Sequence, residues 1–216
     1  MDAPLAAVLE AGRELGYLGP GPVDAHVRHA EALAGLLGDF SGRFVDLGSG
    51  AGVPGLVLAR EWPEARGILI DAAQRRCRFL IEAVDRLELA PRVSVRCGRA
   101  EDLARDQELR DAQGLVVARG FGAPAVVAEC GVGFVEPGGS LVVTEPPPVA
   151  TGPGAAHGVA AGMAARWPED GLELLGLSVV AELRDEIAGV VVLMKHGHTA
   201  ERWPRRAGVP HKRPLW

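Results

Sequence analysis

The residues with the clearest chemical potential form a glycine loop, D-L-G-S-G-A-G, at positions 46–52. Glycines at alternating positions let the backbone turn sharply and leave space for a ligand against it. Asp46 precedes the first glycine by two residues, where its carboxylate could reach the ammonium group of a cofactor directly or through water. The loop therefore predicts a cofactor site that includes Asp46, Gly48, Gly50 and Gly52.

Residue 53 distinguishes two classes of cofactor. A dinucleotide-binding loop would place a third glycine there, but the chain has Val53. S-adenosylmethionine has no pyrophosphate and needs no such turn. Asp71 ends the next apolar run, where a carboxylate could accept hydrogen bonds from both ribose hydroxyls, with a helix N-cap as the alternative role. The pattern favours S-adenosylmethionine over a nicotinamide cofactor.

Short apolar runs alternate with helical patterns around this loop, which predicts an α/β fold with a mainly parallel sheet. The parallel strands are predicted at residues 44–47, 68–70, 93–95, 115–117 and 141–143, and the helices between them at 54–62, 74–89 and 123–134. Residues 175–180 and 190–194 are too close in sequence for a crossover connection, so they predict a C-terminal antiparallel hairpin. This combination is typical of the Rossmann-like class I methyltransferases rather than of dehydrogenases.

We expect three segments along the chain. Residues 1–42 would form an N-terminal helical extension, residues 43–196 the S-adenosylmethionine-binding domain, and residues 197–216 a basic C-terminal tail. The stretch from Pro146 to Gly171 is rich in proline, glycine and alanine, and we expect a mobile connection that faces the substrate there.

The charge distribution points to a polyanionic partner. The chain as a whole carries a net charge of −5, yet the residues from Lys195 to Trp216 are strongly basic. Their prolines should keep the tail extended along a phosphate backbone, and the alternative is a tail packed on the sheet through Trp203 and Leu215 with its charges merely solvated. The basic residues predicted to bind substrate here are Arg205, Arg206, Lys212 and Arg213.

The three cysteines, Cys77, Cys97 and Cys130, are odd in number and widely spaced, so no disulfide framework is expected. No apolar stretch is long enough to span a membrane, and the first residues lack the basic region of a secretory signal. These features predict a cytoplasmic protein. His196-Gly197-His198 has no acidic or cysteine neighbour in the sequence, so no metal site is expected.

Three segments carry a family resemblance: Phe44–Gly55 (F-V-D-L-G-S-G-A-G-V-P-G), Gly98–Asp102 (G-R-A-E-D) and Ala118–Phe121 (A-R-G-F). They resemble the bacterial small-subunit ribosomal RNA guanine-N7 methyltransferases, also called glucose-inhibited division protein B. The resemblance implies ribosomal RNA or the small ribosomal subunit as the partner. It also implies Asp71 on the cofactor's ribose and further cofactor contacts from Gly48, Val53, Ala100, Glu101 and Arg119.

The chain also departs from the family pattern. The family's R-H-x-x-[D/N] motif is present as Arg28 and His29, which we expect to bind substrate, but Ala32 replaces its last residue. Glu145 stands where the family commonly has lysine-glycine after the fifth strand, which predicts a reversed charge near the substrate mouth. A divergent paralogue that acts on another RNA or a small molecule, or a non-catalytic S-adenosylmethionine-binding module, therefore stays open as an alternative.

Arg119 ends the fourth predicted strand, at the edge where ligands bind in doubly wound sheets. It could hold the cofactor's carboxylate or the guanine, and the structural alternative is an ion pair with Glu101 or Glu145. Guanine N7 keeps a free lone pair at neutral pH, so its methylation needs no general base and no catalytic residue is assigned. Carbon-5 methylation of a pyrimidine would need a nucleophilic cysteine, typically after proline, but Cys130 follows Glu129.

Overall fold

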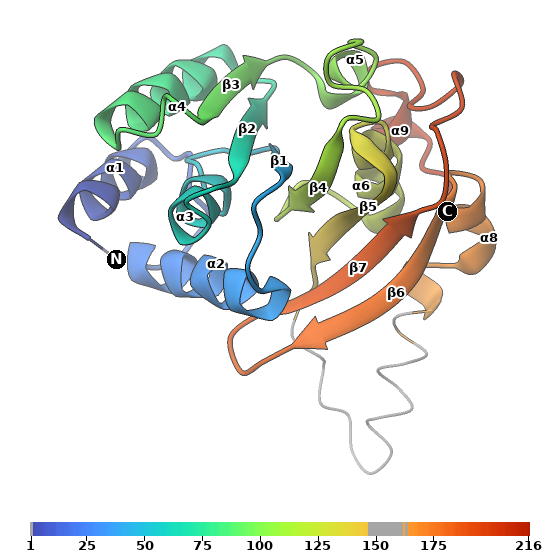
Figure 1. Ribbon diagram of the computed structural model, residues 1–216, viewed down its shortest axis with the longest axis horizontal. Helices are drawn as coiled ribbons and strands as arrows, with labels where there is room; N and C mark the ends of the chain where they lie inside the picture. The colour runs from blue at the N-terminus through green and yellow to red at the C-terminus, as the bar shows by residue number, and fades with distance from the viewer. Residues whose placement is uncertain (1, 147–161, 163) are drawn as a thin grey trace.

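A seven-stranded sheet runs through the part of the chain that the computed structural model describes, residues 2–146, 162 and 164–216 (Figure 1). Its strand order is β3-β2-β1-β4-β5-β7-β6. The strands are β1 (Arg43–Leu47), β2 (Arg66–Asp71), β3 (Val93–Cys97), β4 (Gln113–Ala118), β5 (Val135–Thr144), β6 (Leu177–Arg184) and β7 (Gly189–Lys195). The first five are parallel, and β7 runs antiparallel to both β5 and β6. The predicted fold class, a mainly parallel sheet with a C-terminal antiparallel hairpin, is confirmed.

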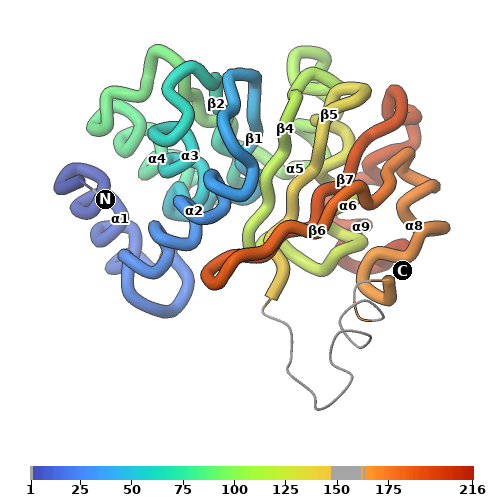
Figure 2. Tube along the Cα trace, turned by 60° about the horizontal axis from the view of Figure 1, so that its bottom comes forward, coloured from blue at the N-terminus to red at the C-terminus, as the bar shows by residue number. Residues whose placement is uncertain are grey.

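Helices cover both faces of this sheet (Figures 1 and 2). One core joins the sheet to α1 (Ala3–Glu14), α2 (Val23–Leu37), α3 (Gly55–Glu61) and α4 (Gln74–Arg86). The other core joins it to α5 (Ala100–Leu103), α6 (Pro124–Val132), α8 (Glu169–Glu173) and the tail with α9 (Val209–Lys212). In β1 the side chains alternate between the two cores, with Phe44 in the first and Val45 and Leu47 in the second, as the two-residue period of a strand requires.

Each outer strand of the sheet has its own character. β3 forms one edge of the sheet and is largely exposed. β6 forms the opposite edge and also has several exposed residues. The pairing of β6 with β7 shifts register between Val179 and Ala181. Val180, at the shift, is 50% exposed.

The C-terminal tail does not extend into solvent, which corrects the prediction from its prolines. Trp203 is buried and its indole N–H donates to the Leu174 carbonyl at 2.9 Å. Pro210 in α9 is buried as well. Burying an aromatic side chain stabilises the folded state by about 2 kcal/mol, so the apolar residues of the tail hold it on the protein despite its charges. The alternative of a packed tail is therefore the correct one, while the three-segment division stays a prediction.

The expectation of no disulfide is wrong for two of the three cysteines. Cys77 and Cys97 are joined, with Cα atoms 5.7 Å apart, although 20 positions separate them in sequence. The parallel pairing of β2 with β3 and the turn into α4 bring them together, which spacing alone does not reveal. Cys130 is free and buried, as expected.

None of the helices in the described ranges is long and apolar enough to cross a membrane. Of the predicted mobile connection between Pro146 and Gly171, residues 147–161 and 163 lie outside the described residues.

Candidate cofactor and acceptor site

The glycine loop leaves the carboxyl end of β1 in a conformation that favours glycine. Gly48, Gly50 and Gly52 all have positive φ, and Gly50 is the one of the three where a new Cβ would meet a backbone atom within 3 Å. Its φ is 57°, and a side chain there would place Cβ 2.9 Å from the Tyr17 carbonyl oxygen. Because that oxygen is backbone, it cannot move aside easily. The loop therefore keeps an open space only with glycine at this position.

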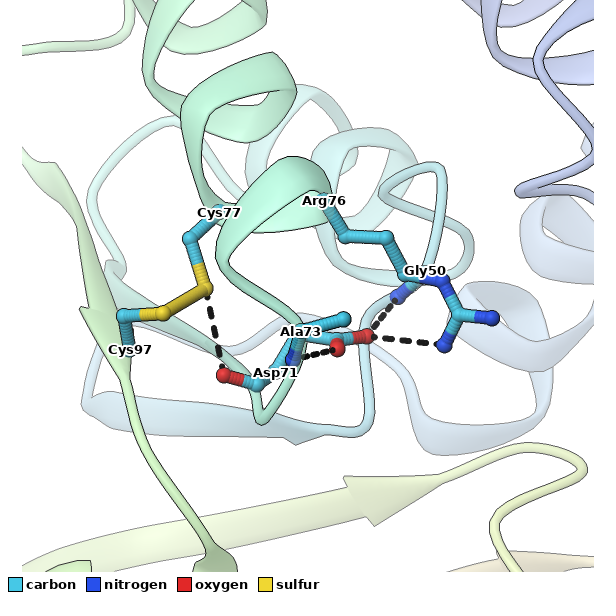
Figure 3. Close-up of a disulfide and its surroundings, with 6 residues drawn as sticks. All are labelled: Gly50, Asp71, Ala73, Arg76, Cys77 and Cys97. Atoms are coloured by element: carbon cyan, nitrogen blue, oxygen red, sulfur yellow. Dashed lines mark hydrogen bonds and ion pairs between the residues drawn. A yellow bond between two sulfur atoms is a disulfide. The ribbon is translucent and has the colours of Figure 1, made fainter.

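Asp71 ends β2 beside the glycine loop, as predicted (Figure 3). Its carboxylate accepts the backbone N–H of Ala73 at 2.8 Å and that of Gly50 at 3.1 Å. The Arg76 guanidinium, on the first turn of α4, lies 3.5 Å from the same carboxylate. Asp71 thus holds both the glycine loop and the entry to α4, but the alternative role of a helix N-cap is wrong, because the N-cap of α4 is Ala73. A bidentate contact with the ribose stays a prediction.

Asp46 is buried beneath the loop rather than open to a ligand. The residue is 1% exposed, and its carboxylate accepts the N–H of Gly55 at the start of α3, at 3.0 Å. Burial raises the pKa of Asp46 to about 6, against the opposing effect of its hydrogen bonds with Ser49 and Gly55. The side chain therefore fixes where α3 begins, and its contact with a cofactor's ammonium group stays a prediction.

A hollow of about 280 Å³ opens beside the glycine loop. Its lining includes the predicted residues Gly48, Gly50, Val53 and Arg119, which come from two different loops. Sequence patterns did not predict several further lining residues, among them Tyr17, His26 and Arg76. The first two come from α2 and the connection before it, and no motif links that region to the loop. A weak signal existed, since Tyr17 is the only tyrosine in the chain and sits in a Gly/Pro-rich break.

Arg119 follows β4 and reaches across the hollow to α2. Its guanidinium hydrogen-bonds His26 Nδ1, and the His26 Nε2 lies 3.1 Å from the Gly19 carbonyl oxygen. Burial lowers the pKa of His26 and the positive charge of Arg119 lowers it further, so the ring is neutral at pH 7. The neutral ring accepts from Arg119 through Nδ1 and donates from Nε2 to Gly19. The expected ion pair of Arg119 with Glu101 or Glu145 is therefore wrong.

Both of those glutamates have other partners. Glu101, in α5 next to Ala100, accepts the Gly208 N–H at 2.7 Å and pairs with Arg99 at 3.2 Å. Its carboxylate therefore holds the tail, and it does not line the hollow beside the glycine loop. Cofactor contacts from Ala100 and Glu101 stay predictions.

The reversed charge expected at Glu145 does not reach the surface. The residue is 7% exposed, and its carboxylate accepts hydrogen bonds from Arg166 Nε at 2.7 Å and Trp167 Nε1 at 2.9 Å. The prediction of a negative substrate mouth is wrong, because a neighbouring cation and an indole satisfy the carboxylate. The departure from the family pattern at this position thus gives no reason to exclude an RNA substrate.

The predicted substrate residues are spread over two regions. Arg28 is exposed on α2 and pairs with Asp24. His29 is half-buried, its Nδ1 has no partner in the described structure, and burial and the charge of Arg119 lower its pKa. Neither residue lines the hollow.

The tail cations also differ among themselves. Arg205 pairs with the fully buried Glu129 of α6 and donates to the Arg213 carbonyl, so it stabilises the tail, and its contact with RNA stays a prediction. Arg206, Lys212 and Arg213 are exposed, and their contacts with RNA stay predictions.

No group of three or more histidine, cysteine or acidic side chains in the described ranges could hold a metal ion. His196 Nε2 lies 2.8 Å from the Ser178 hydroxyl, and His198 Nδ1 lies 3.2 Å from Asp111.

The sheet order, the reversed β7 and the glycine loop after β1 define the class of protein: the Rossmann-like, S-adenosylmethionine-dependent class I methyltransferases. The fold is similar to that of a solved O-methyltransferase from Bacillus cereus in complex with SAH. The TM-score is 0.58 at 14% identity, over 90% of this chain and 91% of that chain. At this identity the likeness concerns the fold alone.

Sequence comparison identifies the family within this class. The family model described as rRNA small subunit methyltransferase G matches residues 23–145. The chain is 33% identical over 180 residues to the ribosomal RNA small subunit methyltransferase G of Leuconostoc citreum, covering 81% of this chain and 70% of that protein. It is 35% identical over 177 residues to the protein of that name from Pelotomaculum thermopropionicum, covering 79% and 69%. The chain belongs to the rRNA small subunit methyltransferase G family.

Proposed function

We propose that the chain transfers a methyl group from S-adenosylmethionine to N7 of a guanine in small-subunit ribosomal RNA, in the cytoplasm. Family membership supports the methyltransferase activity and the ribosomal RNA. The choice of acceptor atom rests on the chemistry of the hollow beside the glycine loop.

The lining of this hollow carries the proposal. None of its described residues is a carboxylate, a lysine or a cysteine, and its charged side chains are the cations Arg76 and Arg119. His26 is neutral, but both ring nitrogens already have partners. An acceptor that must lose a proton would find no free base here. Guanine N7 has a lone pair at neutral pH and needs none.

Catalysis of such a transfer is mainly a matter of position. The methyl group moves in line from sulfur to the acceptor, and positive charge moves with it. Holding the two reactants in contact can supply ~7–11 kcal/mol of the barrier. On this proposal the glycine loop and Asp71 hold the cofactor. Arg119 holds the cofactor's carboxylate or the polar edge of the base, with its direction set by His26.

A covalent route through cysteine has no support in this structure. Cys130 is buried in α6, and burial raises the pKa of its thiol, so that it carries no thiolate at neutral pH. This matches the absence of a proline before it in the sequence.

Nucleoside analysis of ribosomal RNA tests the proposal. Small-subunit RNA from cells with and without the gene would be digested and its 7-methylguanosine measured by mass spectrometry. We expect loss of one such nucleotide per RNA and its return with the wild-type gene. Purified protein with labelled S-adenosylmethionine should methylate the undermethylated subunit or its RNA. An unchanged 7-methylguanosine content, or label at another atom, would contradict the proposal.

A further inference from the structure

The disulfide between Cys77 and Cys97 lies beside Asp71, the residue proposed to contact the cofactor's ribose (Figure 3). Cys77 is in the first turn of α4 and is buried, whereas Cys97 ends β3 and is exposed. A pair with one exposed and one buried cysteine can react with a dissolved oxidant at the exposed residue and close through the buried one. Its position therefore allows the bond to form and break in the folded protein.

Both cysteines lie next to the same residue, Asp71. Asp71 pairs with Cys97 in the register of β2 and β3, and its carbonyl accepts the Gly98 N–H at 3.0 Å. Cys77 Sγ lies 3.2 Å from that carbonyl oxygen. The Asp71 carboxylate meanwhile accepts the N–H of Gly50 at 3.1 Å. Asp71 thus connects the cysteine pair to the glycine loop, because it contacts both.

The two oxidation states hold Asp71 differently. As a thiol, Cys77 can donate its S–H to the Asp71 carbonyl; as a disulfide it has no proton to donate. The disulfide instead ties the start of α4 covalently to the end of β3, directly before the Gly98–Asp102 segment. We propose that Cys77 and Cys97 form a reversible oxidation site, and that its disulfide state binds S-adenosylmethionine and S-adenosylhomocysteine more tightly. This inference rests on the proposed function of the site.

The oxidant that fits the pair is a low-molecular-weight disulfide, RSSR. The Cys97 thiolate attacks one sulfur of RSSR, forming a mixed disulfide and releasing RS⁻. The Cys77 thiolate then attacks the Cys97 sulfur, forming the protein disulfide and releasing the second RS⁻. The two cysteines lose two electrons and two protons, and RSSR becomes two RSH. A dithiol reverses the reaction.

The direction of the effect follows from preorganisation. On the proposed function, the cofactor's nucleoside contacts the Asp71 turn and the Gly98–Asp102 segment. Cross-linking them removes part of their freedom before the ligand binds, so less ordering remains to be done on binding. We expect about tenfold tighter binding in the disulfide state, which corresponds to fixing one or two side chains.

The test measures cofactor affinity in both states of the full chain. Wild-type protein would be treated with glutathione disulfide or with dithiothreitol, and its state confirmed by the mass change of two hydrogens in the peptide pair. Calorimetry with S-adenosylhomocysteine should then give a Kd about tenfold lower for the oxidised protein. Cys97→Ser removes the exposed member and should bind with the reduced affinity under either treatment.

Cys130→Ala is the matched control, because it removes the free cysteine and should keep the full redox response. Equal affinity in the two wild-type states, or a Cys97→Ser protein that still responds, overturns the inference alone. Absence of binding in both states overturns the proposed function together with it. Since the comparison of the two wild-type states needs no substitution, a variant that fails to fold does not decide the outcome.

Discussion

The glycine loop and the C-terminal tail, residues 197–216, both carry residues that sequence motifs and charge single out, but the structure organises them in opposite ways. In the loop, residues that follow β1 and β4 converge on one hollow, together with residues of α2 and α4. In the tail, one cation turns inward to the buried Glu129 while its neighbour Arg206 faces solvent. Strand ends of a parallel sheet converge by topology, whereas neighbouring residues of an irregular segment do not. A motif at a strand end therefore predicts a site better than a count of charges does.

The largest expected effect is in the loop. Gly50→Leu should abolish measurable binding of S-adenosylmethionine, because Cβ would lie 2.9 Å from the Tyr17 carbonyl and the rest of the side chain would fill the hollow. Gly138→Leu is the matched control, since Gly138 also has positive φ, at 83°, but no atom within 4 Å of a new Cβ. Calorimetry should show no binding by the first and wild-type binding by the second. Binding by folded Gly50→Leu protein would contradict the assigned site.

In the tail, Arg205→Ala should reduce the free energy of unfolding by about 3 kcal/mol, because it leaves Glu129 buried without its cation. Arg206→Ala, its exposed neighbour, should change that free energy by less than about 0.5 kcal/mol. Urea unfolding of both variants measures the difference. Equal stabilities would mean that the tail is only loosely attached.

The titration of Asp46 tests whether its carboxyl group is buried beneath the glycine loop. Its pKa is about 6 in the folded protein against 3.8 ordinarily, so between these values the native state holds a proton that the unfolded state has lost. Stability therefore falls as pH rises through this window, by about 3 kcal/mol from this group. Asp46→Asn has no such titration. The unfolding free energy of the variant relative to wild type should thus rise by about this amount between pH 3.5 and pH 7; a constant difference would contradict the shifted pKa.

Arg119→Ala should reduce methyl transfer roughly 100-fold and reduce stability by no more than about 1 kcal/mol, because the guanidinium is only partly buried and its partner is a neutral ring. The pKa of His26 should rise, since the positive charge that lowers it is gone, although burial still holds it below the ordinary value. NMR titration of the ring measures this. A large loss of melting temperature would instead assign Arg119 to the fold.

The smallest effect concerns the outward cations of the tail. Removing one phosphate contact should lower the slope of log RNA affinity against log salt by about 0.7–0.9. Replacing Arg206, Lys212 and Arg213 together by glutamine should therefore reduce the slope by at most about three such steps. Deleting the whole tail is a poor test, because the buried Trp203 would go with it. An unchanged slope would show that these three charges are merely solvated.

Local sequence patterns predicted most of the fold and the site residues that follow the carboxyl ends of the parallel strands. Alternating apolar runs located most strands to within a few residues, although β5 begins at Val135 rather than at residue 141, and the short separation between 180 and 190 required the antiparallel hairpin. Contacts between distant segments could not be predicted: His26 meets Arg119 from 93 positions away, and Glu101 meets Gly208 from 107. The same limit applies to Cys77 and Cys97. Such pairs depend on register and helix placement, which a single sequence does not encode in any spacing.

The register shift in β6 has a consequence for aggregation. An outermost strand offers unpaired backbone groups to a strand of another molecule, and β6 also exposes Val179 and Val180. The extra residue at the shift bends and twists the strand there, so an incoming flat strand could not pair along its whole length. Deleting Val180 would restore continuous pairing with β7. By the same geometry, it would allow β6 to pair with a strand of another molecule and so promote aggregation.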